Sequence, residues 1–364
     1  MNAQKPLWAS QTSFIFAASA AAIGLGNIWR FPYLVGENGG GVFVIAYLIF
    51  VCLLGIPLIL AEIVIGRITQ KNPMAAFADA ARQSNHTRLW GLVGLLAIVT
   101  SFLVVSYYCV ISGWVVDYTF RSIIGQFNNA TEQTTKLAFK MLQGNPYEML
   151  AASSFVLLSS LVINLFGIKD GIERAIMIMF PALLIIMLFL LGYAVTTDGF
   201  WPAVIFLFKP EAHELTRKTI LLALGQAFFS VNIGMGITLM FSAYLPRHVS
   251  SKTAAFSIAI ADTMFALVAG LIIFPIVFTY HIKPSAGPSL IFQSLPIAFG
   301  HMPGGNIIGT LFFFMLFFAA FSSVIATLEP LICLLIENCK MKRPTAVVLT
   351  IVCTWLMSLL TIGS

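Results

Sequence analysis

Hydrophobic residues along this chain gather in long runs that are separated by short polar segments. A membrane-spanning helix needs about 20 mainly apolar residues. By that measure the pattern predicts nine spanning helices, over residues 12–35, 41–65, 90–124, 149–166, 175–195, 218–242, 253–279, 308–336 and 345–362. The pattern is typical of an all-α polytopic membrane protein, and we expect residues 1–364 to form a single transmembrane domain in the lipid bilayer.

Composition and charge agree with this interpretation and give the helices a direction. Hydrophobic residues make up 59% of the chain and charged residues 9%, whereas a soluble domain has about 25% charged residues. Lysine and arginine are spread over the short loops, so the formal charge of +6 does not indicate a nucleic-acid partner. With a cytoplasmic N-terminus, twelve of them fall on the inner side and seven on the outer side. The positive-inside rule therefore predicts a multi-pass protein of the inner (cytoplasmic) membrane with its N-terminus in the cytoplasm.

The first apolar run is interrupted where a lipid-facing helix should continue. Residues 21–41 read "AAIGLGNIWRFPYLVGENGGG". Gly24 and Gly26 loosen the backbone, and Asn27 needs a polar partner. Arg30 carries a charge that costs about 2.5 to 3.5 kcal/mol at the centre of a membrane helix. This stretch is therefore either a loop or a functional part of the protein.

The sixth apolar run is interrupted in a similar way. It reads "LLALGQAFFSVNIGMGITLMFSAYL", with Ser230, Asn232, Gly234 and Gly236 in its middle. Interrupted hydrophobic segments in corresponding places of two halves of a chain indicate a transporter binding site. Backbone groups freed at that depth must line a cavity, because lipid offers them no hydrogen bonds. The alternative to a binding site is that the two interruptions are simple helix kinks packed by small residues.

Several motifs, in order, resemble a known family. They are "WASQTSFIFAASAAAIGLGNIWRFPYLVGENGGGVFVIAYLI", "GIPLILAEIVIGR", "GQAFFSVNIGMG", "GPSLIF" and "FFAAFSSVIATLEP", and they extend over essentially the whole chain. They are similar to those of the neurotransmitter:sodium symporter family, in its bacterial amino-acid transporter branch. The resemblance implies the LeuT-type fold of twelve helices, in which the first ten form two inverted five-helix repeats and helices 1 and 6 are unwound.

This resemblance implies an incomplete fold. We expect residues 12–195 to form the first five-helix repeat and residues 218–364 to form the second repeat without its helix 10. About nine of the twelve family helices would then be present, and the chain would be truncated after helix 9.

The resemblance also implies two Na⁺ sites. Sodium in a membrane needs oxygen ligands from unwound carbonyls and helix ends. The first site would combine the substrate carboxylate with the carbonyl of Ala22 and the side chains of Asn27, Ser230 and Asp262. The second would combine the carbonyls of Ala20, Ile23 and Ala319 with the hydroxyls of Ser322 and Ser323. A protonated or ion-paired Asp262 is the alternative for the first site, and serines that only join helices by hydrogen bonds are the alternative for the second.

A substrate site follows from the same breaks. The amides of Leu25 and Gly26 begin the outer half of helix 1 and would bind a carboxylate, together with the hydroxyl of Tyr108. Carbonyls near Ala21, Phe229 and Ser230 would accept from an amino group. The full set that the resemblance assigns to the substrate is Ala21, Ala22, Leu25, Gly26, Val104, Tyr108, Phe229, Ser230, Asn232, Met235, Ser323 and Thr327. Because Asn232, Met235 and Thr327 depart from LeuT and make the pocket more polar, we do not expect a strictly aliphatic substrate.

Two gates and a chloride prediction complete the expected site. The outer gate would be Tyr108 over Phe229 together with Arg30, whose family partner is an aspartate of helix 10, so we expect Arg30 to be unpaired. The inner gate residues would be Lys5, Trp8, Tyr244 and Glu337. A serine of the family's chloride site is replaced by Ala266, and Asp262 already supplies a negative charge, so we expect no chloride requirement.

The expected function is sodium-coupled symport of an amino acid or a related small amine by alternating access. A truncated member that binds sodium and ligand without transport is the alternative. We do not expect an enzyme, because all five histidines fall in loops and the sequence contains no GxSxG or HExxH motif. A channel is disfavoured because no ring-forming filter is evident. The sequence makes no prediction about the oligomeric state.

Overall fold

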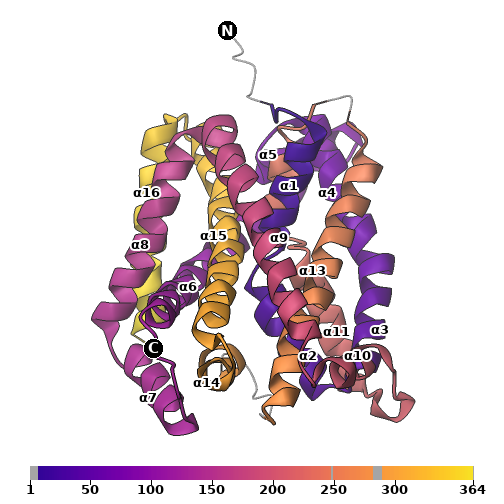
Figure 1. The fold of residues 1–364 in the computed structure, drawn as a ribbon. Coiled ribbons are helices and arrows are strands. Elements are labelled where there is room, and N and C mark those ends of the chain that lie inside the picture. The colour runs from indigo at the N-terminus through magenta and orange to yellow at the C-terminus, as the bar shows by residue number, and fades with distance from the viewer. Residues whose placement is uncertain (1–6, 247–248, 282–288, 364) are drawn as a thin grey trace.

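The computed structural model describes residues 7–246, 249–281 and 289–363, and these residues form one bundle of helices (Figure 1). Within them, seven helices are long and apolar enough to cross a membrane. Their cores are α3 with α4 (Gly41–Phe50 and Ile56–Thr69), α6 (Gly91–Ile123), α8 (Pro146–Leu165), α9 (Arg174–Val195), α13 (Ser251–Thr279), α15 (Gly305–Asn338) and α16 (Arg343–Ile362). Short turns extend or join three of them: η2 (Val51–Gly55), η3 (Arg88–Trp90) and η4 (Ile168–Glu173).

The first predicted helix is broken, as expected. It consists of α1 (Gln11–Ala22), η1 (Gly26–Arg30) and α2 (Phe31–Glu37), and the two halves are bent by 53°. The break begins at Ile23, whose backbone is extended. If the bent pair counts as one span, the described residues contain up to eight spans by length and composition.

The sixth predicted helix is also broken, into α11 (Arg217–Ser230) and α12 (Ile237–Ser242). Three residues of the intervening segment have positive φ: Asn232 at 54°, Gly234 at 78° and Gly236 at 70°. Left-handed backbone is accessible mainly to glycine and, less readily, to asparagine. The residue types that interrupt the apolar run are thus those that the break requires.

Short helices cover the two ends of the bundle (Figure 1). One end carries α5 (Pro73–Gln83), and we call it the α5 end. The opposite end, which we call the α7 end, carries α7 (Glu132–Gln143), α10 (Phe200–Phe208) and α14 (Leu295–His301), with the turns η5 (Ala212–Glu214) and η6 (Leu290–Ser294).

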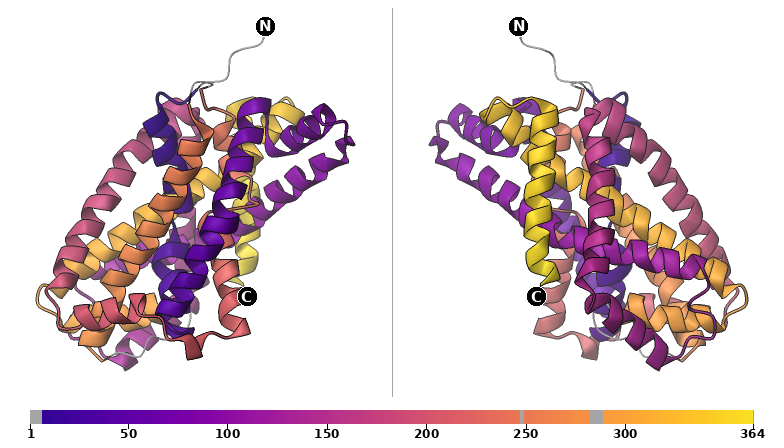
Figure 2. Two further views of the ribbon diagram at one scale, coloured as in Figure 1. Left: turned by 90° about the vertical axis from the view of Figure 1, so that its right-hand side faces the viewer. Right: turned by 90° about the vertical axis from the view of Figure 1, so that its left-hand side faces the viewer.

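Two helices, α13 and α15, form the centre of the bundle and are the most enclosed of the spans. α1 packs against both of them, so the first break lies in the middle of the protein. α6 crosses α15, and α8 and α16 pack side by side on α6 at one edge (Figure 2). Each of the nine apolar segments predicted from the sequence contains helix, but the first and the sixth are interrupted, and the sixth is not among the spans counted above in the described residues. The division into two repeats stays a prediction.

Candidate functional site

A small cavity of ≈ 30 Å³ lies where the two broken helices meet α6 and α15. It is lined by Ala22, Gly24, Gly26, Val104, Tyr108, Phe229, Ser230, Asn232, Met235, Ser323 and Thr327. All of these except Gly24 were assigned to the substrate from the sequence. The other two residues of that prediction, Ala21 and Leu25, lie beside the cavity and bond to residues that line it.

The two glycines of the first break are needed because other groups approach them closely. A Cβ atom on Gly24 would lie 2.6 Å from the hydroxyl of Tyr108 and 2.8 Å from that of Ser323. A Cβ atom on Gly26 would lie 2.7 Å from the ring of Phe229. Real Cβ contacts are longer, so the glycines allow three side chains to close on the broken helix.

The side chains predicted to bind the first sodium ion meet in the structure. Asn27 Nδ2 donates to Asp262 Oδ1 at 2.8 Å and to Ser230 Oγ at 3.1 Å. Ser230 Oγ donates to Asp262 Oδ2 at 2.5 Å. All three side chains are buried, and Asp262 is 0% exposed. Ala22, the fourth expected ligand, lines the adjoining cavity.

Sequence reasoning missed Tyr47 of α3 in this cluster. Its hydroxyl lies 3.5 Å from Asp262 Oδ2 and 3.4 Å from Ser230 Oγ. Asn27, Ser230 and Tyr47 thus all direct donors at the carboxylate, and donors suit an ionised carboxylate, which only accepts. A tyrosine within the apolar run 41–65 was the available signal, but its partner is 215 residues away.

The groups predicted for the second sodium ion also meet. Ser322 Oγ lies 2.8 Å from Ala20 O and 3.1 Å from Ala319 O. Ser323 Oγ lies 3.1 Å from Ala319 O and 3.5 Å from Ile23 O. Five neutral oxygens from α1, its break and α15 therefore converge, and they are the hard ligands that sodium takes at unwound helices.

At both the expected carboxylate end and the expected amino end of the site, groups assigned to the substrate already bond to other protein groups. Leu25 N donates to the hydroxyl of Tyr108 at 2.9 Å, so the two donors assigned to the carboxylate lie together. At the other end, Ala21 O already accepts from Asn232 Nδ2 at 2.7 Å and from Ser323 Oγ at 3.1 Å. The Ala21 carbonyl is therefore already engaged by protein donors.

At the α7 side of the cavity, Arg30 contacts neutral groups, and the expectation that it lacks its family ion-pair partner stays a prediction. Its guanidinium donates to Gln226 Oε1 at 2.9 Å and lies 4.9 Å from the centre of the Phe229 ring. Gln226 Nε2 in turn donates to Gly26 O at 3.1 Å. Sequence reasoning missed Gln226, because a glutamine one turn before Phe229 is ordinary in a helix.

A second cavity of ≈ 290 Å³ lies directly on the α7 side of these side chains. It shares Gly26, Tyr108 and Phe229 with the smaller cavity. Its remaining lining residues are Leu25, Trp29, Arg30, Tyr33, Tyr107 and Ile111. Tyr108 and Phe229 therefore lie at the boundary of the two cavities, and their role as the outer gate stays a prediction.

At the α5 side lie the three predicted inner-gate residues that the structure describes, Trp8, Tyr244 and Glu337. Trp8 is 2% exposed, its Nε1 donates to Phe241 O at 2.8 Å, and its backbone N donates to Tyr244 O at 3.1 Å. Glu337 accepts from the backbone N and the Nδ2 of Asn72 at 2.8 and 2.7 Å. Lys5 lies outside the described residues.

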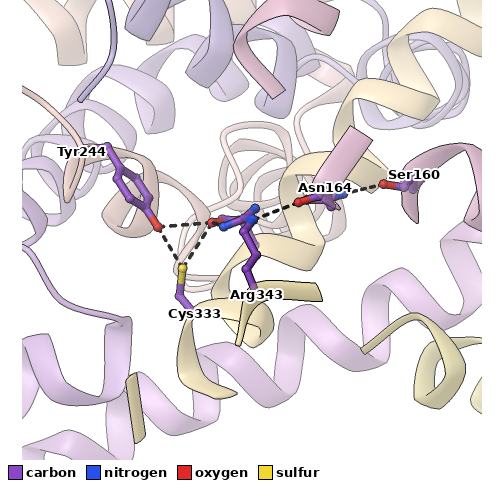
Figure 3. Close-up of polar contacts among 6 residues, drawn as sticks. Ser160, Asn164, Tyr244, Cys333 and Arg343 are labelled. Carbon is purple, nitrogen blue, oxygen red and sulfur yellow. Dashed lines mark hydrogen bonds and ion pairs between the residues drawn. The ribbon is translucent and has the colours of Figure 1, made fainter. Parts of the chain in front are cut away.

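An ion pair between a buried acid and a partly exposed arginine lies on the same side, and sequence reasoning did not assign it a role (Figure 3). Arg343 NH1 and NH2 donate to Glu329 Oε1 and Oε2 at 3.0 and 2.7 Å. Tyr244 donates to Glu329 Oε1 at 3.2 Å, and Cys333 Sγ lies 2.9 Å from the Tyr244 hydroxyl. Arg343 Nε also donates to Asn164 O at 2.9 Å. An acid inside an apolar run was the signal that could have identified Glu329.

Comparisons with known proteins identify the family. Residues 5–138 and 143–364 match the family described as "Sodium:neurotransmitter symporter family". An uncharacterized sodium-dependent transporter of Haemophilus influenzae is 35% identical over 356 residues, which are 96% of this chain and 78% of that protein. YhdH, an uncharacterized sodium-dependent transporter of Bacillus subtilis, is 35% identical over 344 residues, or 94% of this chain and 75% of that protein.

A crystal structure of MhsT in complex with L-phenylalanine is similar with a TM-score of 0.90 and 36% identity, over 98% of this chain and 80% of that one. The fold is thus of the LeuT type, and the expectation that it is incomplete stays a prediction. The relatives are transporters, in agreement with the expectation that the chain is not an enzyme. Because the match runs over nearly the whole chain and these relatives exceed 30% identity, the chain belongs to the sodium:neurotransmitter symporter family and is a sodium-coupled membrane transporter.

Proposed function

We propose that the protein carries an amino acid or a related small amine together with Na⁺ by alternating access across the cytoplasmic membrane. The observation that carries this proposal is the convergence of two oxygen clusters on one cavity at the breaks of two helices. Asp262 anchors the first cluster and Ser322 the second. Each sodium charge that crosses the membrane supplies about 2.3 kcal/mol per 100 mV, which is sufficient to concentrate a neutral solute.

The cavity suits a zwitterion. The hydroxyl of Tyr108, which accepts from Leu25 N, and the amide of Gly26 would donate to the carboxylate at the start of η1, where the helix dipole is positive. The C-terminal end of α11 offers carbonyls for the amino group. Because Ala21 O is already engaged, we assign its predicted part to Asn232 Oδ1, which accepts no hydrogen bond from the described residues.

The absence of a chloride requirement is part of the proposal. Asp262 carries its charge at the centre of the donors from Ser230, Asn27 and Tyr47. A second anion there would lie in direct repulsion with the carboxylate. Uptake at fixed sodium should therefore be the same in chloride and in gluconate.

The orientation follows from the loop charges. We assign the α5 end to the cytoplasm, because the inner loops carry the excess of lysine and arginine. The α7 end then faces the outside, and the cavity of ≈ 290 Å³ opens toward it. Labelling a single cysteine introduced at Lys140, on α7, with an impermeant thiol reagent in intact cells tests this assignment.

Binding and uptake test the function. The purified protein should be stabilised against heat by an amino acid in sodium but not in potassium, and proteoliposomes should accumulate that amino acid along a sodium gradient. Ser322→Ala removes a hydroxyl from the second cluster and should raise the sodium concentration needed for half-maximal binding several-fold. Ser358→Ala is the matched control, because Ser358 is a buried serine of α16 whose hydroxyl bonds to Trp355 O of its own helix. Equal stabilisation in both salts contradicts symport, and sodium-dependent binding without uptake favours the non-transporting alternative.

A further inference from the structure

Most polar side chains around the small cavity already donate their hydrogens to other groups of the protein. Ser230 Oγ donates to Asp262, and Asn232 Nδ2 donates to Ala21 O. Because the Ala21 oxygen can only accept, the amide of Asn232 must present its nitrogen there and its oxygen elsewhere. Ser323 Oγ lies among backbone carbonyls, including Ala21 O at 3.1 Å. Leu25 N is likewise engaged, because it donates to the Tyr108 hydroxyl. The donor that remains for a ligand among these groups is therefore the Tyr108 hydroxyl itself, where the carboxylate is expected.

Thr327 lines another part of the cavity, and its hydroxyl hydrogen is also donated to a protein group. It lies on α15 one turn beyond Ser323 and donates its hydroxyl hydrogen to Ser323 O at 2.6 Å. Its own carbonyl accepts from Ser101 of α6 at 3.2 Å, so its backbone is held from a second side. The side chain is 5% exposed. With its hydrogen on the backbone, the hydroxyl of Thr327 offers the cavity only lone pairs.

Few other groups around the cavity could recognise the side chain of a substrate. The residues that line the cavity carry no charge. Once the carboxylate end and the amino end are assigned, the side chains left are mainly Val104 and Met235, which are apolar, and Thr327. A ligand with an apolar group beside Thr327 would displace water from that oxygen without replacing the hydrogen bond, which costs affinity.

We infer that Thr327 is a specificity-determining residue whose oxygen selects neutral amino acids with a hydrogen-bond donor in the side chain, such as a hydroxyl or an amide, over apolar amino acids of the same shape. The inference rests on the proposed function and narrows its substrate class. Sites that hydrogen-bond a substrate group discriminate against the analogue that lacks it. One such bond corresponds to about tenfold in affinity.

The test compares amino acids in matched pairs, so that size does not decide the outcome. Dissociation constants for serine and alanine, threonine and valine, and glutamine and methionine are measured in sodium with the purified full chain. In every pair that binds, the member with the side-chain donor should bind about tenfold more tightly. Equal or tighter binding of the apolar members overturns the inference.

Variants then assign the preference to one atom. Thr327→Val keeps the branched shape, removes the oxygen and should bring the ratio within each pair close to one. Thr327→Ser keeps a hydroxyl and should retain the preference. Thr354→Val is the matched control, since Thr354 of α16 makes the same kind of backbone bond, to Thr350 O at 2.8 Å, away from the cavity. A preference that survives Thr327→Val, or that disappears in Thr354→Val, contradicts the inference.

Failure of the proposed function would look different from failure of this inference. If the wild type binds no amino acid in sodium, the proposed function is wrong. If amino acids bind in sodium but the paired ratios are equal, only the assignment to Thr327 is wrong. The ratio in the wild type tests the inference even where Thr327→Val does not fold.

Discussion

Different polar contacts lie on the two sides of the small cavity. On the α7 side, Arg30 lies over the ring of Phe229 and donates to two neutral acceptors, the amide of Gln226 and the carbonyl of Gly225. On the α5 side, Glu329 and Arg343 form a two-bond ion pair in which the acid is 0% exposed. A cation over a ring and an amide can separate and be resolvated at modest cost, whereas a buried acid cannot lose its partner alone.

The difference suggests how each side opens. Arg30 borders the cavity of ≈ 290 Å³, where water can hydrate it. Its contacts with Phe229 and Gln226 can therefore break one at a time. We expect Glu329 and Arg343 to remain together, because separation would leave an uncompensated buried charge. Opening at the α5 side would then separate Tyr244 from the pair, with α15 and the start of α16 moving as one unit.

The largest effect should come from breaking the ion pair. Arg343→Ala leaves the Glu329 carboxylate, which is 0% exposed, without its guanidinium, and we expect a loss of about 3 to 5 kcal/mol in stability. Thermal unfolding in detergent measures it. Asp170→Asn is the control, because the Arg174–Asp170 pair is exposed and should contribute about 0 to 1 kcal/mol. If the two variants unfold at similar temperatures, the ion pair on the α5 side contributes no more than an exposed pair, and the contrast with the Arg30 side is wrong.

A smaller effect is expected from Gly26→Ala. The added Cβ would lie 2.7 Å from the Phe229 ring, and overpacking of this kind costs about 1 to 3 kcal/mol. Because the ring must move, sodium-dependent binding of the amino acid should weaken more than stability falls. Gly192→Ala, at a glycine with nothing within 4 Å of its Cβ position, should leave binding unchanged. Unaltered binding in Gly26→Ala would show that the ring does not close on the break.

Arg30→Ala should have an effect of about 1 to 2 kcal/mol, through loss of the ring contact and of the bond to Gln226. We expect it in the dissociation rate of the ligand rather than in the unfolding temperature, since the closure lies between the ligand and the outer cavity. Dissociation of a labelled amino acid in sodium measures it. A drop in thermal stability as large as that of Arg343→Ala would contradict the proposed contrast.

The smallest effect is expected from Cys333→Ser. Serine keeps a donor between Tyr244 and Glu329, so stability should change by less than about 1 kcal/mol. Cys333→Val has a similar size but no donor and should cost more. If both variants behave alike, the thiol acts only by packing and is not part of the hydrogen-bonded network.

The site was predictable to different degrees in its different regions. The residues at both breaks, and ten of those that line the cavity, follow from local sequence and from resemblance to the family. Tyr47 and Gln226 were missed, although each contacts a predicted residue. Their roles depend on partners 215 and 196 residues away, Asp262 and Arg30, and neither side chain is unusual in its own helix.

The sequence by itself determined the spanning helices and the position of the two breaks. Helix length follows from uninterrupted apolar residues, and the breaks follow from Asn232, Gly234 and Gly236 and their counterparts in residues 21–41, because backbone freedom is a local property. Only the tertiary structure decided which charges are satisfied. It gave Arg30 a neutral partner and Glu329 a charged one, because burial requires a partner for every polar group but does not specify which residue supplies it.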